Sequence, residues 1–253
     1  MSRGDYSMSL SIQEISIIIA AKDLSPSLLN PDFLKYSDIV PSDWQYDQDP
    51  VVTNNGARIS YNNGIRITSQ PNRVAFAQIV PSQDQPQFLI HSMAAKFAET
   101  LPNAAYLAVG INPRGLVPFF DNERGAHEFL FQKLFAMGSW QEFGQAPAQA
   151  AIQLSYVLEQ GQLNLAINEA KLKGQEGQSV SAVVFSGNFN YPVRGEAGIK
   201  RVQNVKERIQ LWQSTVGTFQ QLVNERFLGV ANEPSSTSDI PMAPPSIESE
   251  MVL

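Results

Sequence analysis

Short β-branched, apolar or alternating runs of hydrophobic residues occur along several stretches of the chain, and these patterns predict β-strands. The first stretch covers residues 10–19, where β-branched residues dominate. A second covers 106–111 and leads into 112–115 (Asn-Pro-Arg-Gly), which we expect to form a loop. A third covers 180–193 and has large apolar residues at its odd positions. The pattern therefore predicts a chain rich in β structure.

The Asn-Gly pair that ends at Gly64 predicts a β-hairpin. A two-residue loop there would scatter the flanking apolar residues over both faces. A three-residue loop with Gly64 in the left-handed conformation instead pairs Ile59 with Ile67 and keeps the apolar side chains on one face. A further turn at 70–73 returns the chain along the same face, which completes a three-stranded meander. A Gln-Gly turn at 160–161 predicts another hairpin for the same reason.

Apolar residues at helical spacing predict three helices. One covers 88–101, and another begins after a cap at Asp121 or Asn122 and ends at Gly138. The strongest helical pattern lies near the C-terminus, where apolar residues recur every three or four positions: Val202, Val205, Ile209, Trp212, Val216, Phe219 and Val223. We expect this long helix to lie on the sheet with Trp212 buried at the contact. A coiled-coil seam is the alternative for such a stripe.

Strands followed by a helix occur twice, at about 57–101 and 151–227. We therefore expect an α+β protein in which two antiparallel strand–helix units form one curved sheet covered by the long C-terminal helix. Its organisation is predicted to be a flexible N-terminus (1–9), a single α+β domain (10–230) and a disordered acidic tail (231–253). The domain would consist of two similar halves, about 10–115 and 116–230.

Composition narrows the function classes. The chain has 253 residues and no cysteine, which excludes disulfides, thiolate metal sites, iron–sulfur clusters and thiol nucleophiles. The net charge is −6, and the tail contributes four acidic residues with no basic one. The apolar run 15–21 is too short to span a membrane, and no basic segment precedes it as in a secretory signal. We therefore expect a cytoplasmic protein with no membrane partner.

Motifs for metal and nucleotide chemistry are incomplete. His127 and Glu128 resemble the start of a zincin motif, but Phe131 occupies the position of the second histidine. Gly110 and Gly115 have the spacing of a phosphate-binding loop, yet Leu and Val follow in place of Lys and Ser or Thr. A nucleophile elbow and a dinucleotide fingerprint are also missing. We expect no metal and no cofactor.

The shortage of catalytic groups argues against an enzyme without excluding one. If the protein is an enzyme, its best candidate catalytic residues are Arg114, Asp121 and His127, which we expect near one loop. A basic cluster surrounds the start of the long helix: Arg194, Lys200, Arg201, Lys206 and Arg208. This cluster could serve an anionic partner or pair with the chain's own acidic segment 23–50. Nucleic acid is disfavoured because no aromatic residues are interleaved with these charges.

Two segments are candidates for contact with a partner. Phe33, Tyr36, Trp44 and Tyr46 lie between prolines and aspartates, and aromatic residues in such a setting make good interface anchors. The alternative is that these aromatics fill the edge of the core. The chain ends in Met251-Val252-Leu253, an apolar carboxyl terminus that a groove in another protein can capture.

Several stretches resemble an uncharacterised bacterial family that is common in cyanobacteria. They are 28–36 (LLNPDFLKY), 63–73 (NGIRITSQPNR), 108–115 (AVGINPRG) and 185–189 (FSGNF). The resemblance covers about 10–228 and leaves the tail outside. This family has no assigned activity, so the resemblance implies only a bacterial cytoplasmic setting.

These observations favour a non-catalytic cytoplasmic protein that binds another protein, as an adaptor, assembly factor or regulatory partner. The rival hypothesis is a small-ligand-binding protein with a pocket between the sheet and the long helix, and an unfamiliar enzyme comes third. A sealed core favours the first hypothesis, whereas a deep apolar cavity with a few inward polar groups favours the second.

Overall fold

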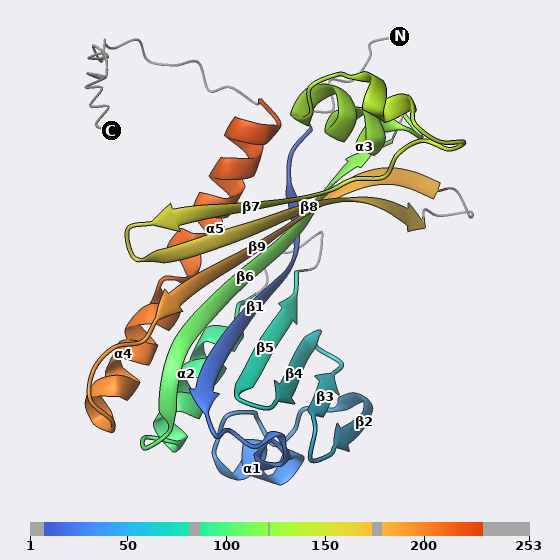
Figure 1. Ribbon diagram of the computed structural model, residues 1–253. Helices are drawn as coiled ribbons and strands as arrows, with labels where there is room; N and C mark the ends of the chain where they lie inside the picture. The colour runs from blue at the N-terminus through green and yellow to red at the C-terminus, as the bar shows by residue number, and fades with distance from the viewer. Residues whose placement is uncertain (1–7, 81–86, 121, 174–178, 230–253) are drawn as a thin grey trace, which may run out of the picture.

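The fold is α+β, built on one open antiparallel sheet (Figure 1). A computed structural model describes residues 8–80, 87–120, 122–173 and 179–229. Within these residues nine strands form a single sheet in the order β2-β3-β4-β5-β1-β6-β9-β8-β7. Their bounds are β1 Ser11–Lys22, β2 Tyr46–Val52, β3 Ala57–Tyr61, β4 Ile65–Gln70, β5 Arg73–Ile79, β6 Ala105–Phe119, β7 Ala151–Leu158, β8 Gly161–Lys173 and β9 Ser179–Pro192. The twist turns β7 and β8 across the direction of β3 and β4.

The main helices lie on one side of this sheet (Figure 1). They are α2 (Ile90–Thr100) and a long bent C-terminal helix formed by α4 (Ile199–Gln210), α5 (Trp212–Gln221) and a π-helical turn (Leu222–Phe227). Shorter elements are a 3₁₀ turn (Pro26–Leu28), α1 (Pro31–Tyr36), α3 (Gly125–Glu128), a π-helical turn (Phe129–Leu134) and a 3₁₀ turn (Ser139–Glu142). None of the helices in the described ranges is long and apolar enough to cross a membrane.

Strand register gathers the apolar side chains on the helix-covered face. A row of eight residues crosses the sheet from β3 to β7, with one residue from each strand: Ile59, Ile67, Phe76, Ile17, Ile111, Phe189, Leu163 and Tyr156. The first seven are at most 1% exposed. Because side chains alternate between faces, this row places the intervening polar residues on the opposite face.

The predicted meander is confirmed. Ile59 pairs with Ile67, and Gly64 has a φ of +79° as the three-residue loop requires. The hairpin at 160–161 is also confirmed, with Leu154 opposite Leu165. These turns could be predicted because each brings apolar residues that are near in sequence onto one face.

The loop predicted at 112–115 is wrong, because β6 continues through it to Phe119. Pro113 lies opposite Ile15 of β1. The next residues of β6, Arg114 and Gly115, lie opposite Glu14 and Ile12, so the register of β1 shifts between these two residues. At Gly115 an added Cβ would lie 2.8 Å from the carbonyl oxygen of Ser11. Proline and glycine therefore serve a β-bulge and a close strand approach, not a chain reversal.

The predicted long helix is present but it bends, and the contact expected of Trp212 is wrong. Trp212 is only half-buried, stacks on His91 and packs against Phe88 near the start of α2, with ring centroids 5.3 and 5.1 Å away. The buried position on the sheet side belongs to Thr215, whose hydroxyl lies 2.7 Å from the Tyr191 hydroxyl. The same Thr215 hydroxyl donates to the carbonyl oxygen of Leu211 four residues earlier, an arrangement that often bends helices.

Apart from the edge strand β2, the strand order is symmetric about the central pair of β1 and β6. On one side β5, β4 and β3 follow β1, and on the other side β9, β8 and β7 follow β6. In the chain, α2 comes after β3–β5 and α4 comes after β7–β9. The predicted flexible N-terminus (1–9, apart from its last two residues) and the predicted disordered tail (231–253) lie outside the described residues.

Replacing Tyr106 should change how the stability depends on alkaline pH. Its ring is 1% exposed, and burial raises the pKa of this phenol well above its usual value. A raised folded-state pKa leaves stability intact below pH ~10 and removes about 1.4 kcal/mol per pH unit above it. We therefore expect Tyr106→Phe to lose stability less steeply than the wild type in urea unfolding above pH ~10. Tyr36→Phe, at an exposed ring, should match the wild-type slope, and equal slopes for all three proteins would contradict this account.

The helix bend predicts unequal costs for two aromatic substitutions. Phe219 is fully buried, so Phe219→Ala should lower the unfolding free energy by about 3–5 kcal/mol. Trp212→Ala should cost less, because the half-buried indole packs mainly on α2. Chemical denaturation of both variants gives the comparison. A larger loss for Trp212→Ala would show that the indole, and not Thr215, closes the sheet side of the helix.

Candidate functional site

The helix-free face of the sheet, here called the open face, is lined by polar and short side chains. Cross-strand register aligns Ser60, Arg66, Ala77, Ser16 and Asn112 on consecutive strands, and Asn188, Asn164 and Ser155 extend the row towards β7. These residues alternate in sequence with the buried apolar row. The same register that builds the core therefore builds the open face.

A hollow of about 440 Å³ lies in the middle of the open face. It spans β1, β6, β9, β8 and β7, and its polar lining consists of Glu14, Ser16, Asn112, Arg114, Gln153, Ser155, Asn164, Ser186 and Asn188. Short residues also line the sheet beside it: at Gly110 an added Cβ would make only ordinary contacts, 3.5 Å from Cβ of Ile18. A partner could therefore approach the strand backbones closely here.

Asn112 offers a hydrogen-bond acceptor within this hollow. Its Oδ1 atom is buried and has no hydrogen-bond partner in the part of the chain that the structure describes. An unpaired buried acceptor costs about 1–3 kcal/mol, and a donor from a bound molecule would recover much of that. The Asn112 side chain is therefore suited to receive an N–H or O–H group.

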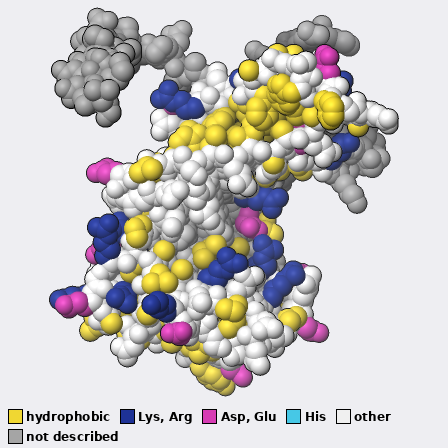
Figure 2. Space-filling model, in the orientation of Figure 1, with side chains coloured by type: hydrophobic (Ala, Val, Ile, Leu, Met, Phe, Trp, Pro, Cys, Tyr) yellow, Lys and Arg dark blue, Asp and Glu magenta, His cyan; other side chains and the backbone are white. Residues whose placement is uncertain are grey.

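Charge on the open face is mainly positive. Arg58, Arg66, Arg73 and Arg114 lie on the strands from β3 to β6, and Glu14 faces the same way. β7 and β9 contain no charged residue. This contrasts with the net charge of −6 for the whole chain. In Figure 2, basic and acidic side chains also gather where the molecule narrows, between its end that carries α3 and the rest.

Glu14 orients one of these arginines, Arg66. Its Oε2 atom lies 2.8 Å from Nη2 of Arg66, and Arg114 lies opposite Glu14 in the register of β1 and β6. The two ion-paired side chains are 26% and 40% exposed, so the pair contributes at most about 1 kcal/mol to stability. Its main effect is to orient Arg66 beside the hollow, while Arg114 is exposed.

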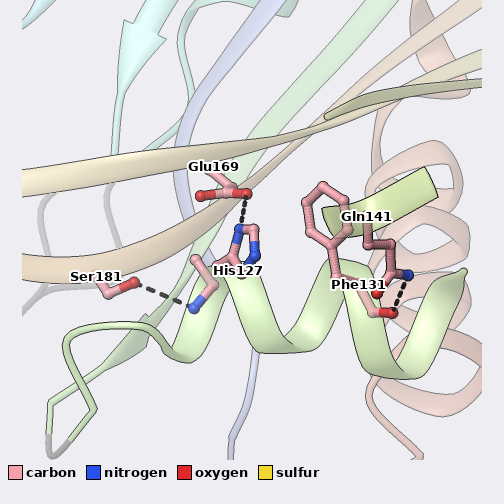
Figure 3. Close-up of polar contacts among 6 residues, drawn as sticks. His127, Phe131, Gln141, Glu169 and Ser181 are labelled. Atoms are coloured by element: carbon pink, nitrogen blue, oxygen red, sulfur yellow. Dashed lines mark hydrogen bonds and ion pairs between the residues drawn. The ribbon is translucent and has the colours of Figure 1, made fainter. Parts of the chain in front are cut away.

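A second cleft, of about 610 Å³, lies between α3 and the end of β8 (Figure 3). Nδ1 of His127 lies 3.2 Å from Oε1 of Glu169, and the imidazole stacks on Phe131 at 4.2 Å between ring centroids. Ser181 anchors the start of α3, because its hydroxyl accepts a hydrogen bond from the Ala126 N–H at 3.1 Å. Gly125 is required beside it, since an added Cβ would lie 2.5 Å from the Phe119 ring.

The second cleft brings together a histidine and a carboxylate but no complete catalytic set. Glu169 can orient the His127 imidazole. Ser181 is bonded to the Ala126 amide, and no hydrogen bond joins it to His127 in the described residues. Within those same residues, no group of three or more His, Cys, Asp or Glu side chains is placed to hold a metal ion. The cleft can bind a polar molecule, and its geometry indicates no particular reaction.

The structure does not unite the three residues expected near one loop. Arg114 lies in β6 beside the hollow of the open face, whereas His127 lies in α3 beside the second cleft. Asp121 lies outside the described residues. The common loop fails because 112–115 belongs to a continuous strand.

The aromatic residues predicted to bind a partner divide into two kinds. Trp44 and Tyr46 pack on Tyr61 with ring centroids 5.2 and 5.4 Å away, and Phe33 packs edge-on against Phe97. Tyr36 differs, because its side chain is 87% exposed. Met251, Val252 and Leu253 lie outside the described residues.

The basic cluster at the start of the long helix is largely engaged within the protein. Lys206 pairs with Glu99 at 2.5 Å, a contact that lowers the pKa of this carboxyl. Lys200 pairs with Glu196, Arg201 donates to the carbonyl oxygen of Gly195, and Arg208 donates to Gln160. These contacts leave less of the cluster's charge for an external anion.

The residues of the open face were missed by the sequence analysis, apart from Arg114, which it considered as a catalytic residue. Ser16, Asn112 and Asn164 each alternate with apolar neighbours, which was the available signal. Their meeting in one row depends on pairing between strands far apart in the chain.

Ser181→Ala should weaken the attachment of α3. The substitution removes the acceptor of the buried Ala126 N–H, and an unpaired buried donor costs about 1–3 kcal/mol. We expect faster hydrogen exchange at the Ala126 amide and a loss of stability of that order. The exposed Ser155→Ala provides the control, with a change of at most about 0.5 kcal/mol. Unchanged protection at Ala126 would contradict the anchoring role.

Comparison with known proteins gives no relative from which a function could be transferred: no family model matches the chain, and no curated protein or solved structure shows significant similarity to it.

Proposed function

We propose that this is a non-catalytic cytoplasmic protein that binds another protein, and that an extended acidic segment of that partner docks on the open face. The observation that carries the proposal is the asymmetry of the sheet. The main helices pack on one side, while the other side presents short polar residues and arginines. An adaptor, an assembly factor and a regulatory partner would each use such a surface.

The interior supports a surface site over an internal one. Between the sheet and the long helix, the side chains of Val205, Ile209, Phe219 and Val223 are each at most 1% exposed. These residues fill the space in which the small-ligand hypothesis expected a pocket. Close packing of this kind leaves no room for a ligand without displacing core side chains.

Charge complementarity supports a partner with acidic side chains. Four arginines and one glutamate face outward on β3, β4, β5, β1 and β6, so the surface favours carboxylates. The neighbouring strands β7 to β9 add amides and hydroxyls, which suit the backbone of an extended peptide. A peptide with acidic side chains and free backbone groups matches both parts of the surface.

The proposal includes the organisation of the fold into two similar strand–helix units. Support comes from the strand order, which mirrors β3-β4-β5-β1 in β7-β8-β9-β6, with a helix after each triplet. If each unit consists of one central strand, three further strands and a helix, the second unit begins with β6, close to residue 105. The hollow then lies where the two units join.

The aromatic residues of the sequence analysis stay part of the proposal. Tyr36 is the member of the set with a freely accessible ring. Phe33, Trp44 and Tyr46 contact the core, and would contribute to binding mainly through their exposed edges.

The rival hypothesis, a small-ligand-binding protein, is supported by the second cleft. His127 and Glu169 form a polar pair beside about 610 Å³ of space, and Glu123, Arg124 and Lys171 add charges of both signs at its lining. A small polar molecule with both donors and acceptors would fit such a lining. Its place differs from the pocket expected between the sheet and the long helix.

Arg66→Ala and Arg114→Ala should weaken binding of an acidic peptide. The probe is a fluorescein-labelled peptide of alternating Glu and Ser, and binding is followed by fluorescence anisotropy. Each substitution should weaken affinity about two- to fivefold, as for an ion pair worth up to about 1 kcal/mol. Affinity should also fall as salt rises from about 50 to about 300 mM.

Lys200→Ala is the matched control, because Lys200 is an exposed cation on α4 and its side chain is 80% exposed. This variant should bind the peptide as the wild type does. Equal loss of peptide affinity in all three variants would show that binding depends only on the net charge of the protein, and would contradict the open-face site. Tighter binding of a single-stranded oligonucleotide than of the peptide would overturn the choice of a protein partner.

A further inference from the structure

An exposed apolar surface lies at the end of the molecule that carries α3. We call it the apolar tip and define it by Phe135, Met137, Trp140 and Phe143. Met137, Trp140 and Phe143 are 72%, 50% and 88% exposed. In Figure 2 the largest hydrophobic area lies over this lobe. Large apolar patches on soluble proteins mark contact sites.

The tip is a packed aromatic cluster. Phe131, which is 3% exposed, forms its base and contacts Phe135 and Trp140 with ring centroids 5.7 and 5.9 Å away. Phe135 and Trp140 are 5.8 Å apart in an edge-to-face arrangement. Gln141 donates a hydrogen bond to the Phe131 carbonyl oxygen, which holds the 3₁₀ turn against the π-helical turn. The cluster therefore presents a preformed apolar surface.

The C-terminal end of the fold leaves the molecule next to this surface. Nζ of Lys133 donates a hydrogen bond to the carbonyl oxygen of Leu228 at 2.9 Å. Lys133 belongs to the π-helical turn that leads directly into Phe135. Gly229, the last residue described before the tail, thus lies next to Lys133, two residues before Phe135 of the tip.

The sequence beyond this point has the composition and length to cover the tip. Residues 230–253 include Ile240, Met242, Ile247 and the terminal Met251-Val252-Leu253. At about 3.3 Å per residue, such a segment can reach on the order of 80 Å when extended. Tethering beside the target raises the effective concentration to the order of mM, so weak apolar contacts suffice. Lys133, which bonds the carbonyl oxygen of Leu228, has a charge complementary to the four acidic residues of the tail.

We propose that residues 240–253 bind back onto the apolar tip of their own chain. The sequence analysis assigned Met251, Val252 and Leu253 to a partner, and the partner in this proposal is the tip itself. The tail in this arrangement covers the aromatic cluster until a competing molecule displaces it. The proposal is independent of the open-face site, which lies on the sheet between β3 and β7.

Trp140 fluorescence tests this contact in a Trp44→Phe, Trp212→Phe background. Acrylamide quenching is compared between the full chain and a chain truncated after Gly229. We expect severalfold stronger quenching and severalfold more binding of an apolar dye in the truncated protein. A synthetic peptide of residues 240–253, added in trans, should restore the shielding. Equal quenching in both chains would overturn the proposal.

Full-length variants separate the apolar contact from other effects. Met251→Asp with Leu253→Asp should expose Trp140 as the truncation does, whereas Ser235→Asp with Ser236→Asp adds the same charge and should leave it shielded. Shielding that depends on protein concentration over about a hundredfold range would identify a second copy as the occupant and refute the proposal. Binding of the full-length chain to lipid vesicles with a blue shift of Trp140 would equally refute it.

Discussion

The structure depends on the antiparallel pairing of β1 with β6 at the centre of the sheet. Each of these strands has a further partner, β5 on one side and β9 on the other, so the pair joins the two flanking sets of strands. Its register places Ile17 opposite Ile111 on the helix side and Ser16 opposite Asn112 on the open side. A shift by one residue would exchange the two faces and expose the isoleucines to water.

The two faces of the sheet consequently have different chemistry and different roles. Burial of the apolar row against α2 and the long helix supplies most of the driving force for folding. The polar row is not needed for that burial, so its residues can be chosen for contact with a partner. Glu14 illustrates the point, because it orients Arg66 at the surface while its neighbour Ile15 fills the core.

Local patterns allowed much of the fold to be predicted. The meander around Gly64 follows from neighbouring residues, as does the long helix with its apolar stripe. The bend at Leu211 was not predicted: the Thr215 hydroxyl donates to the Leu211 carbonyl oxygen and also bonds Tyr191 of β9, and this second contact depends on the tertiary fold. The continuation of β6 through Pro113 was missed for a related reason: the bulge that accommodates it lies in β1. Of the candidate site only Arg114 was singled out, for a catalytic role, since the row of residues exists only once distant strands have paired.

The central pairing also constrains how the chain is made on the ribosome. β1 ends at Lys22, whereas β6 ends only at Phe119. At roughly 5–20 residues per second, about 5–20 s pass before the whole of β6 has been added. During that time the isoleucine-rich β1 has β5 as its earliest native neighbour and one edge without its native partner. Newly made chains are therefore most exposed to aggregation and to chaperone binding before the second half of the sheet exists.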